Sequence, residues 1–225
     1  MQAENNYLKL KEFCLKEGID LFGVADICSI KHEFKVSLKI LDKVNLAISL
    51  GLRLSKAILD EIEDSPTRLY FHHYRTVNTF LDQIALKVSN YIQRKGYTAI
   101  PIPASQIIDW QNQRAHLSHK KIGYLAGLGW IGRNNLLVNP KFGSQFRLVS
   151  ILTDFILKID LPLRLDCGDC FGCLKACPVS AIKEDPKDFD HLGCFQKLKD
   201  FQKQRLVDQY ICGICVKVCK GRLVL

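Results

Sequence analysis

The chain has 225 residues, of which 48% are hydrophobic and 24% charged, and its mean hydropathy is +0.01. This composition is typical of a soluble globular protein, and the longest uncharged apolar stretch, around "VNLAISLGL", is too short to cross a bilayer. The formal net charge is +9, but the basic residues are scattered, so we expect a diffuse basic face that attracts acidic proteins, and not a nucleic-acid patch.

Helices and strands alternate in the first part of the chain. The start, "MQAENNYLKLKEF", has no basic region followed by an apolar run, so we expect no signal peptide and a cytoplasmic protein. Apolar residues that recur every three or four positions predict a long helix that closes at Gly96. The predicted elements are a helix at 6–17, strands at 20–27 and 43–52, and the long helix at 67–95.

The middle of the chain predicts a strand, a shorter helix and a hairpin. Prolines in the strand indicate a sheet edge or a strand end. The shorter helix is expected to end on Gly127, and the hairpin is expected to turn at 141–144. The predicted elements are the strand 97–103, the helix 113–127 and the hairpin 135–154.

This irregular order predicts an α+β protein with two domains. Residues 1–160 are expected to form a mixed α/β layered domain. Residues 161–225 are expected to form a cysteine-rich domain, because eight of the ten cysteines lie between positions 167 and 219. Cys14 and Cys28 stand apart near the start of the chain, and we interpret both as buried small hydrophobic residues.

The cysteine-rich segment begins with "CGDCFGCLKACP", which has the C-x2-C-x2-C-x3-C-P spacing of bacterial ferredoxins. A second set follows, in which Cys194 precedes "CGICVKVC". A cytosolic chain keeps its thiols reduced, so eight thiols in two sets predict two [4Fe–4S] clusters. In the ferredoxin pattern the fourth cysteine of the run ligates the other cluster. The predicted ligand sets are Cys167, Cys170, Cys173 and Cys219 for one cluster, and Cys177, Cys194, Cys212 and Cys215 for the other.

Two zinc sites are the alternative to clusters, because pairs of cysteines in C-x2-C spacing also bind zinc. Zinc ribbons, however, pair two separated C-x2-C knuckles. They do not place three cysteines at this interval before a C-x3-C-P sequence. The spacing therefore favours iron–sulfur clusters.

The stretch "LAGLGWIGRNNLL" contains Gly127, Gly129 and Gly132 in the pattern G-x-G-x-x-G. This pattern binds dinucleotides when a strand enters the first glycine and a helix starts at the third. Here a helix end is predicted before Gly127 and an extended segment after Gly132. The context fails on both sides, so we do not expect a nicotinamide cofactor.

The segments "AGLGWIGRNNLLVNPKFGSQFRLVSILTD", "CGDCFGCLKACPVSAI" and "CGICVKVC" together resemble the epoxyqueuosine reductase family, whose members depend on cobalamin and iron–sulfur clusters and are related to the reductive dehalogenases. The resemblance implies a corrinoid-reductase-like domain at 1–160 and a bacterial-ferredoxin-like double-cluster domain at 161–225. It also implies that the cobalamin pocket is lined by Gly127, Gly129, Trp130 and Gly132. A tight connection between helix and hairpin, with Trp130 as a core anchor, is the alternative for these residues.

The sequence departs from that family at the proton donor. Counting back 14 residues from Gly127 to the position of the family's catalytic aspartate gives Gln113. Asp109 and His116 are nearby candidates for a catalytic acid, although neither is in register. The sequence also ends six residues after Cys219, without the helical extension that holds tRNA in the family, so tRNA is not expected as a substrate.

The predicted function is that of an oxidoreductase. Electrons from a low-potential donor such as ferredoxin or flavodoxin pass through the two clusters to a corrinoid, which reduces a small organic substrate. The alternative is a ferredoxin-like electron-transfer protein that holds the clusters and no corrinoid. The first hypothesis predicts cobalt as well as iron, and the second predicts iron alone. Neither involves a membrane.

Overall fold

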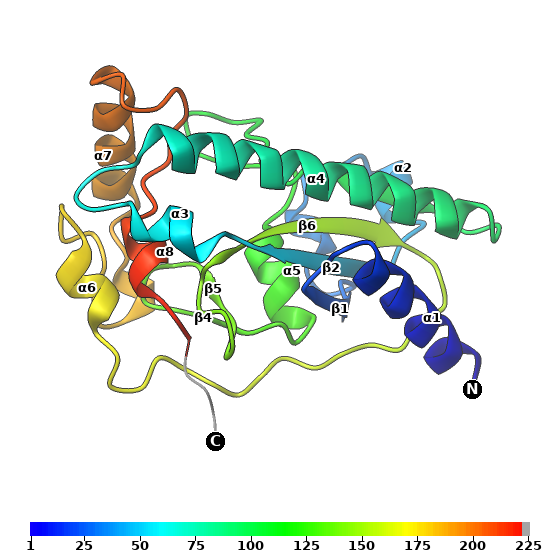
Figure 1. The fold of residues 1–225 in the computed structure, drawn as a ribbon. Helices are drawn as coiled ribbons and strands as arrows, with labels where there is room; N and C mark the ends of the chain where they lie inside the picture. The colour runs from blue at the N-terminus through cyan, green and yellow to red at the C-terminus, as the bar shows by residue number, and fades with distance from the viewer. Residues whose placement is uncertain (222–225) are drawn as a thin grey trace. The chain divides into compact units, whose positions relative to one another are not determined.

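The structure, a computed structural model, describes residues 1–221 and divides into two compact units (Figure 1). The second unit is larger than the predicted cysteine-rich domain, because it also takes in two earlier segments of the chain. The first unit contains residues 1–52, 78–128 and 147–163, and the second contains residues 53–77, 129–146 and the chain from 164 onward.

A four-stranded sheet with the order β1-β2-β6-β3 forms the centre of the first unit. β1 is antiparallel to β2, with Leu21 opposite Gly51, and β3 is antiparallel to β6, with Ala99 opposite Thr153. β3 lies at the edge of the sheet, where the missing N–H of Pro101 is tolerated. The strands are β1 (Leu21–Asp26), β2 (Leu46–Arg53), β3 (Ala99–Ile102) and β6 (Phe146–Thr153).

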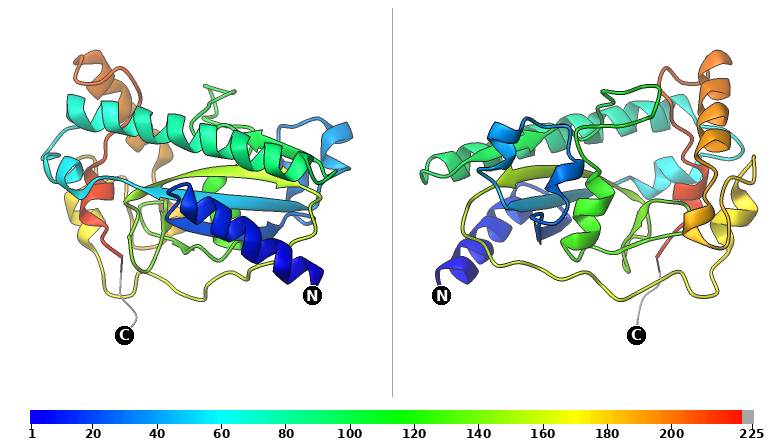
Figure 2. Two further views of the ribbon diagram at one scale, coloured as in Figure 1. Left: turned by 45° about the vertical axis from the view of Figure 1, so that its right-hand side comes forward. Right: turned by 180° about the vertical axis from the view of Figure 1, so that it is seen from behind.

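Helices cover both faces of this sheet (Figure 2). α1 and the C-terminal part of α4 lie on one face, where the rings of Phe13 and Tyr91 stack with centroids 5.3 Å apart. α5 packs against β1 on the other face, and a Cβ on Gly23 of β1 would lie 2.2 Å from the carbonyl oxygen of Ala126. The helices of this unit are α1 (Gln2–Lys16), η1 (Lys31–Glu33), α2 (Leu38–Leu41), α4 (Arg68–Gln93), which begins in the second unit, and α5 (His119–Leu125).

The core of the first unit lies between the sheet and these helices. Its fully buried side chains include Val24, Ile48, Ile151, Leu81 and Val88. Burying an aliphatic side chain of this size contributes about 1.5–3 kcal/mol, so the apolar periodicity that predicted the strands and the long helix also stabilises them. Among the helices of residues 1–221, none is both long and apolar enough to span a bilayer.

The two isolated cysteines differ. Cys14 of α1 is fully buried, as predicted, and burial raises the pKa of its thiol to about 12. Cys28 is exposed, so the prediction of a buried residue is wrong there. Cys28 lies on the turn after β1, where its N–H donates a hydrogen bond to the carboxylate of Asp26 at 2.8 Å. Its side chain on this turn is exposed to solvent.

Two predicted elements also differ from the structure. The helix predicted at 113–127 is confirmed only as α5, because Ser118 is its N-cap and the preceding residues form turns. The hairpin predicted at 135–154 is confirmed only at its turn, where Asn139 and Gly143 form an antiparallel bridge, and its two strands do not pair. β5 (Leu137–Val138) pairs backward with β4 (Trp130–Ile131), and β6 joins the large sheet instead.

The second unit consists of short elements connected by loops. Its α8 packs against both α6 and α3. The ammonium of Lys217 in α8 donates hydrogen bonds to the carbonyls of Asp60 and Ile62 at the end of α3. Besides the β4–β5 hairpin, its elements are α3 (Lys56–Asp60), α6 (Gly172–Ala176), η2 (Pro186–Asp188), α7 (His191–Lys203) and α8 (Ile214–Val218).

Candidate functional site

All eight cysteines of the predicted ligand sets lie in the second unit, and all have free thiols. The two helices α6 and α8 carry cysteines at equivalent positions. Cys173 and Cys215 are each the second residue of a five-residue helix, and Cys177 and Cys219 each cap the C-terminus of that helix. Cys194 lies on α7, and the other three precede α6 or α8 in loops.

Burial raises the pKa values of five of these thiols, Cys173, Cys194, Cys212, Cys215 and Cys219, and repulsion from neighbouring cysteines adds to each rise. In the first group, burial raises the pKa of Cys173 to about 11, and its three partners in the predicted set add to the effect. In the second group, burial raises the pKa of Cys212 to about 11 and also raises the pKa of Cys215, with added repulsion from members of that set. Cys173 also contributes to the shift at Cys215, across the two groups. The grouping follows the predicted sets, and ligation itself stays a prediction.

Groups of buried thiols are costly to ionise, because each ionised sulfur disfavours the next. A cationic centre removes this cost by binding the thiolates directly. Within residues 1–221, no three His, Cys, Asp or Glu side chains lie close enough to share one metal ion. A four-iron cluster binds each thiolate at a separate iron, so its cysteines lie farther apart than the ligands of a single ion.

Arg133 holds the loop that carries the first two cysteines. Its guanidinium donates hydrogen bonds to the carbonyls of Glu184 at 2.8 Å, Gly168 at 3.0 Å and Cys170 at 3.1 Å. The same group lies over the ring of Phe171, 4.4 Å from its centroid. The planar fork of an arginine suits this task, because its donors are fixed relative to one another. The loop is therefore positioned through its backbone, and its sulfurs stay available.

Gly127 ends α5 in a left-handed conformation with φ +69°. Its N–H donates to the carbonyl of Tyr124, and the N–H of Leu128 donates to the carbonyl of Gly123, which is the Schellman arrangement of a helix C-terminus. A Cβ at position 127 would also lie 2.7 Å from the carbonyl oxygen of Leu161. Both facts require glycine here for reasons internal to the first unit.

Gly129 and Gly132 allow the β4–β5 hairpin to close. A Cβ at position 129 would lie 2.0 Å from the carbonyl oxygen of Val138, and one at position 132 would lie 2.6 Å from the side chain of Val138. Between them, Trp130 is 4% exposed and its indole N–H points at the sulfur of Cys167. As predicted, a helix ends before the first glycine. The segment after Gly132 is a turn at 133–136 and becomes extended only in β5, so the predicted extended segment is wrong at its start, but no helix begins at the third glycine and the arrangement is not that of a dinucleotide site.

The candidate acids have defined partners. The carboxylate of Asp109 accepts hydrogen bonds from the backbone and side chain of Asn112 at 3.0 and 2.9 Å, which lower the pKa of Asp109. An exposed carboxyl with a lowered pKa is ionised at neutral pH and has no proton to donate. Nδ1 of His116 lies 2.9 Å from the carbonyl oxygen of Lys35, so Nδ1 is the nitrogen that donates this hydrogen bond. Nε2 is then the ring nitrogen left to contact a substrate. Gln113 has φ +53°, a sparsely populated conformation that is often found at functional sites.

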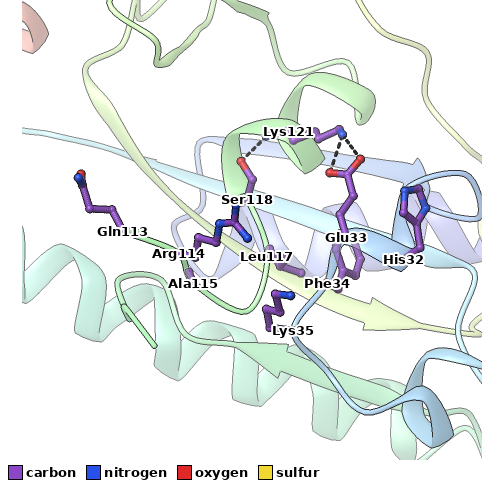
Figure 3. Close-up of a pocket in the computed structure, with 10 residues that line it drawn as sticks. All are labelled: His32, Glu33, Phe34, Lys35, Gln113, Arg114, Ala115, Leu117, Ser118 and Lys121. Atoms are coloured by element: carbon purple, nitrogen blue, oxygen red, sulfur yellow. Dashed lines mark hydrogen bonds and ion pairs between the residues drawn. The ribbon is translucent and has the colours of Figure 1, made fainter. Parts of the chain in front are cut away.

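A pocket of about 580 Å³ lies within the first unit, and Gln113 lines it (Figure 3). Its charged lining consists of Lys35, Arg114, Lys121 and a single carboxylate, that of Glu33. The ammonium of Lys121 contacts both carboxylate oxygens of Glu33, at 2.6 and 2.7 Å. With one of the three cations balanced in this way, the pocket has an excess of positive charge.

The buried side chains of Phe34 and Leu117 give this pocket an apolar wall. Sequence reasoning missed the pocket, because its lining comes from two segments about 80 positions apart that have no shared spacing or motif. The two segments meet through backbone hydrogen bonding, in which the N–H of Lys35 donates to the carbonyl of His116 at 2.8 Å. Only the position of Gln113, through the family resemblance, pointed toward this region.

Comparison with known proteins tests the family resemblance directly. No family model matches the chain. The chain is 27% identical over 239 residues to an epoxyqueuosine reductase of Cyclobacterium marinum, a match that covers 93% of this chain and 77% of that protein. It is 36% identical over 103 residues to an epoxyqueuosine reductase of Leadbetterella byssophila, covering 42% of this chain and 33% of that protein. The predicted resemblance to epoxyqueuosine reductases is confirmed.

The mixed α/β fold is that of reductive dehalogenases and epoxyqueuosine reductases. The catabolic reductive dehalogenase NpRdhA in complex with 3-bromo-4-hydroxybenzoic acid has a TM-score of 0.74 at 18% identity, over 96% of this chain and 32% of that one. The epoxyqueuosine reductase of Streptococcus thermophilus has a TM-score of 0.64 at 18% identity, over 94% of this chain and 65% of that one. At these identities the likeness shows the fold alone. The chain spans about a third of the dehalogenase and of the Leadbetterella protein.

Two further solved structures with this fold have known ligands or chemistry. One is a reductive dehalogenase described as suggesting a mechanism for B12-dependent dehalogenation, with a TM-score of 0.67 and 19% identity over 81% of this chain and 26% of that one. The other is an epoxyqueuosine reductase with an epoxyqueuosine-modified tRNA stem loop, with a TM-score of 0.61 and 19% identity over 94% of this chain and 64% of that one.

Proposed function

We propose that this chain is an iron–sulfur redox protein that binds two [4Fe–4S] clusters in its second unit, in a ferredoxin-like arrangement. One observation carries the proposal: eight free cysteines with ferredoxin spacing lie in the second unit, on or beside the helices α6, α7 and α8. The residues fit such clusters, because the thiols are reduced, partly buried and supplied with donors such as the N–H of Ala181, which lies 3.3 Å from the sulfur of Cys177.

Clusters of this kind accept and release single electrons at low potential when they are bound. The chain holds the sulfurs on the ends of two short helices, fixes the first loop through Arg133 and donates hydrogen bonds to the sulfurs. The electron donor in this proposal is an acidic low-potential protein such as a ferredoxin or flavodoxin, since the formal charge of the chain is +9. The rate of reduction by such a donor is therefore expected to fall as ionic strength rises.

We further propose that the electrons pass to a corrinoid-dependent reaction. The support comes from the fold, which is shared with a B12-dependent dehalogenase. A corrinoid supplies a cobalt centre that takes up electrons. The predicted pocket glycines do not fit this role by themselves, because the space beside Gly127, Gly129 and Gly132 is filled by the chain's own backbone and side chains.

That same packing favours a second candidate function, an electron-transfer protein without a corrinoid. Its glycines serve the turn after α5 and the β4–β5 hairpin, and Gln113 stands where the family has its acid. In this case the clusters pass electrons to a partner enzyme.

The pocket of the first unit supports a small organic anion as substrate. Its volume of about 580 Å³ is in the range of sites for small organic molecules. Lys35 and Arg114 suit a carboxylate or phosphate group, and Phe34 and Leu117 suit an apolar body. A neighbour with the same fold binds a hydroxybenzoic acid, whereas another binds a tRNA stem loop. We favour the small anion, because the volume of the pocket suits a small molecule and its charged lining is mostly cationic.

The test is anaerobic reconstitution of the full chain with iron and sulfide, with and without a cobalamin, followed by metal analysis. About eight irons with stoichiometric cobalt support the corrinoid-dependent reductase. About eight irons without cobalt support the electron-transfer protein. A folded chain that takes up zinc and no iron contradicts both. For the substrate, 4-hydroxybenzoate is expected to bind the wild-type chain more than tenfold better than Arg114→Gln, while a tRNA stem loop binds neither.

A further inference from the structure

Two side chains from one segment of the second unit donate hydrogen bonds to sulfurs of the first ligand set. The indole Nε1 of Trp130 lies 3.4 Å from the sulfur of Cys167. The N–H of Ser144 donates to the carbonyl oxygen of Cys219 at 3.3 Å, and a hydrogen bond from the Ser144 hydroxyl to the Cys219 thiol opposes the rise in the pKa of that thiol. Both side chains are nearly inaccessible to water, with Trp130 4% and Ser144 3% exposed.

These donors are fixed in direction by their surroundings. The side-chain amide of Asn134 donates to the oxygen of Ser144 at 3.1 Å, so the hydrogen of Ser144 is left for the sulfur of Cys219. The amide oxygen of Asn134 in turn accepts from the N–H of Leu136 at 3.2 Å, which determines which end of the amide faces Ser144. The donor pair is therefore pre-oriented before any cluster binds.

The chain also approaches the cysteines closely on both sides. A Cβ at Gly143 would lie 1.9 Å from the carbonyl oxygen of Cys219, and one at Gly132 would lie 3.4 Å from the sulfur of Cys167. The first contact requires glycine at position 143, whereas the second is an ordinary van der Waals distance, so segment 129–146 lies against both ends of the first ligand set.

The sulfurs of the second ligand set accept hydrogen bonds from backbone N–H groups. The sulfur of Cys177 accepts from the backbone N–H of Ala181 at 3.3 Å, and that of Cys212 accepts from the backbone N–H of Ile214. Its four cysteines are all of intermediate exposure, whereas the first set includes both the buried Cys173 and the exposed Cys170. A reduced cluster carries one more negative charge than the oxidised cluster. Hydrogen-bond donors and water near its sulfurs therefore stabilise the reduced form, whereas burial without such donors destabilises it.

We propose that Trp130 and Ser144 raise the reduction potential of the cluster bound by the first set, and thereby make it the acceptor of electrons from the other cluster. The inference rests on the proposed function, since it needs both clusters. One electron leaves the second cluster and enters the first, with no proton or bond exchanged. In this account Trp130 and Ser144 are positioning residues that act through the ligands.

The test is an EPR-monitored redox titration of the full chain after anaerobic reconstitution, with dithionite as reductant. Trp130→Phe and Ser144→Ala are each expected to shift the ratio of reduced to oxidised cluster at fixed potential about tenfold toward the oxidised form, which is about 59 mV for one electron. Both shifts fall on the same cluster, while the other keeps its potential. Trp110→Phe is the matched control, because the only other tryptophan is 58% exposed and is expected to change neither potential.

A second measurement covers the case in which Trp130→Phe fails to assemble. In the Trp110→Phe background, ¹⁵N-indole labelling makes Trp130 the only labelled side chain, and pulsed EPR of the reduced protein is expected to show a ¹⁵N coupling to one cluster. Absence of that coupling, or equal shifts of both clusters in the variants, overturns the inference alone. A wild-type chain without iron overturns the proposed function and the inference with it.

Discussion

The two units of this chain are stabilised in different ways. The first has a four-stranded sheet covered by helices, and its core consists of fully buried aliphatic side chains. The second has a two-stranded hairpin and, around its cysteines, two helices of only five residues. Isolated helices of that length are not stable in water. From this comparison we predict that apolar burial suffices for the first unit, whereas the short helices α6 and α8 of the second unit also depend on the proposed clusters.

The largest expected effect comes from removing iron. Chelation of iron from the reconstituted chain is expected to abolish the slow hydrogen exchange of amides in α6 and α8, because metal binding contributes directly to folding. Amides of β2 and β6 within the first unit are expected to keep their protection within about tenfold. Equal loss of protection in the sheet would contradict the comparison, since both units would then depend on the clusters.

Cys177→Ser is expected to have the next largest effect. Cys177 caps α6 and belongs to the second ligand set, so its loss removes one cluster and loosens the loops around both. Iron content is expected to fall by about half or more, as measured by metal analysis and absorption. Cys28→Ser is the control, because Cys28 is exposed in the first unit and is expected to leave the iron content unchanged. Loss of iron in the control variant as well would argue against the assigned ligands.

Ile151→Ala sharpens the comparison from the other side. Ile151 is fully buried in β6, so its truncation is expected to lower the free energy of unfolding of the first unit by about 4 kcal/mol. Urea unfolding with hydrogen exchange measures this, and the iron content is expected to stay constant. Leu8→Ala, at a side chain that is 55% exposed, is expected to cost less than about 0.5 kcal/mol. If the Ile151 variant lost its clusters while still folded, the units would be coupled.

The smallest expected effect is a pH dependence in the first unit. Nε2 of His119 lies 2.8 Å from the carbonyl oxygen of Pro103, and Nδ1 lies 2.9 Å from the hydroxyl of Ser150, so the neutral ring both donates and accepts. Burial is the main cause that lowers the pKa of His119 to about 4, below its value in the unfolded chain. The unfolded state therefore takes up a proton first as pH falls.

The stabilising effect of the neutral ring is then fully present above about pH 6.5 and is lost as pH falls toward about 4, with a size on the order of 2 kcal/mol. Urea unfolding of the first unit at several pH values measures this. His119→Gln is expected to be less stable at neutral pH and to have a flatter pH dependence in that window. A wild-type stability that stays constant between those pH values would show that His119 is not held neutral.

Much of the first unit could be predicted from sequence, because its signals are local. The period of apolar residues in α4 and the buried runs of β1 and β2 each identify an element. The strand pairing could not be predicted, since β6 and β5 are adjacent in sequence and the choice between a hairpin and separate sheets depends on distant partners. The start of α5 was also predicted too early, because Ser118 caps the helix and the residues before it form turns.

The candidate sites divide in the same way. The cysteine spacing predicted the two ligand sets, because bound clusters impose fixed intervals on the chain. The donors Trp130 and Ser144 and the loop anchor Arg133 could not be assigned from sequence, since they act on cysteines more than 30 positions away. The pocket around Arg114 has no sequence signal besides the position of Gln113, because its shape arises only when segments far apart meet.

The most direct test of the account is native mass spectrometry of the anaerobically reconstituted chain. The account predicts a wild-type mass increased by two [4Fe–4S] units. It predicts that Cys219→Ser and Cys194→Ser, which affect different ligand sets, each retain one unit. A wild-type mass that corresponds to bound zinc, or to a single cluster that survives both substitutions, would contradict the central claim that the second unit holds two clusters on two sets of four cysteines.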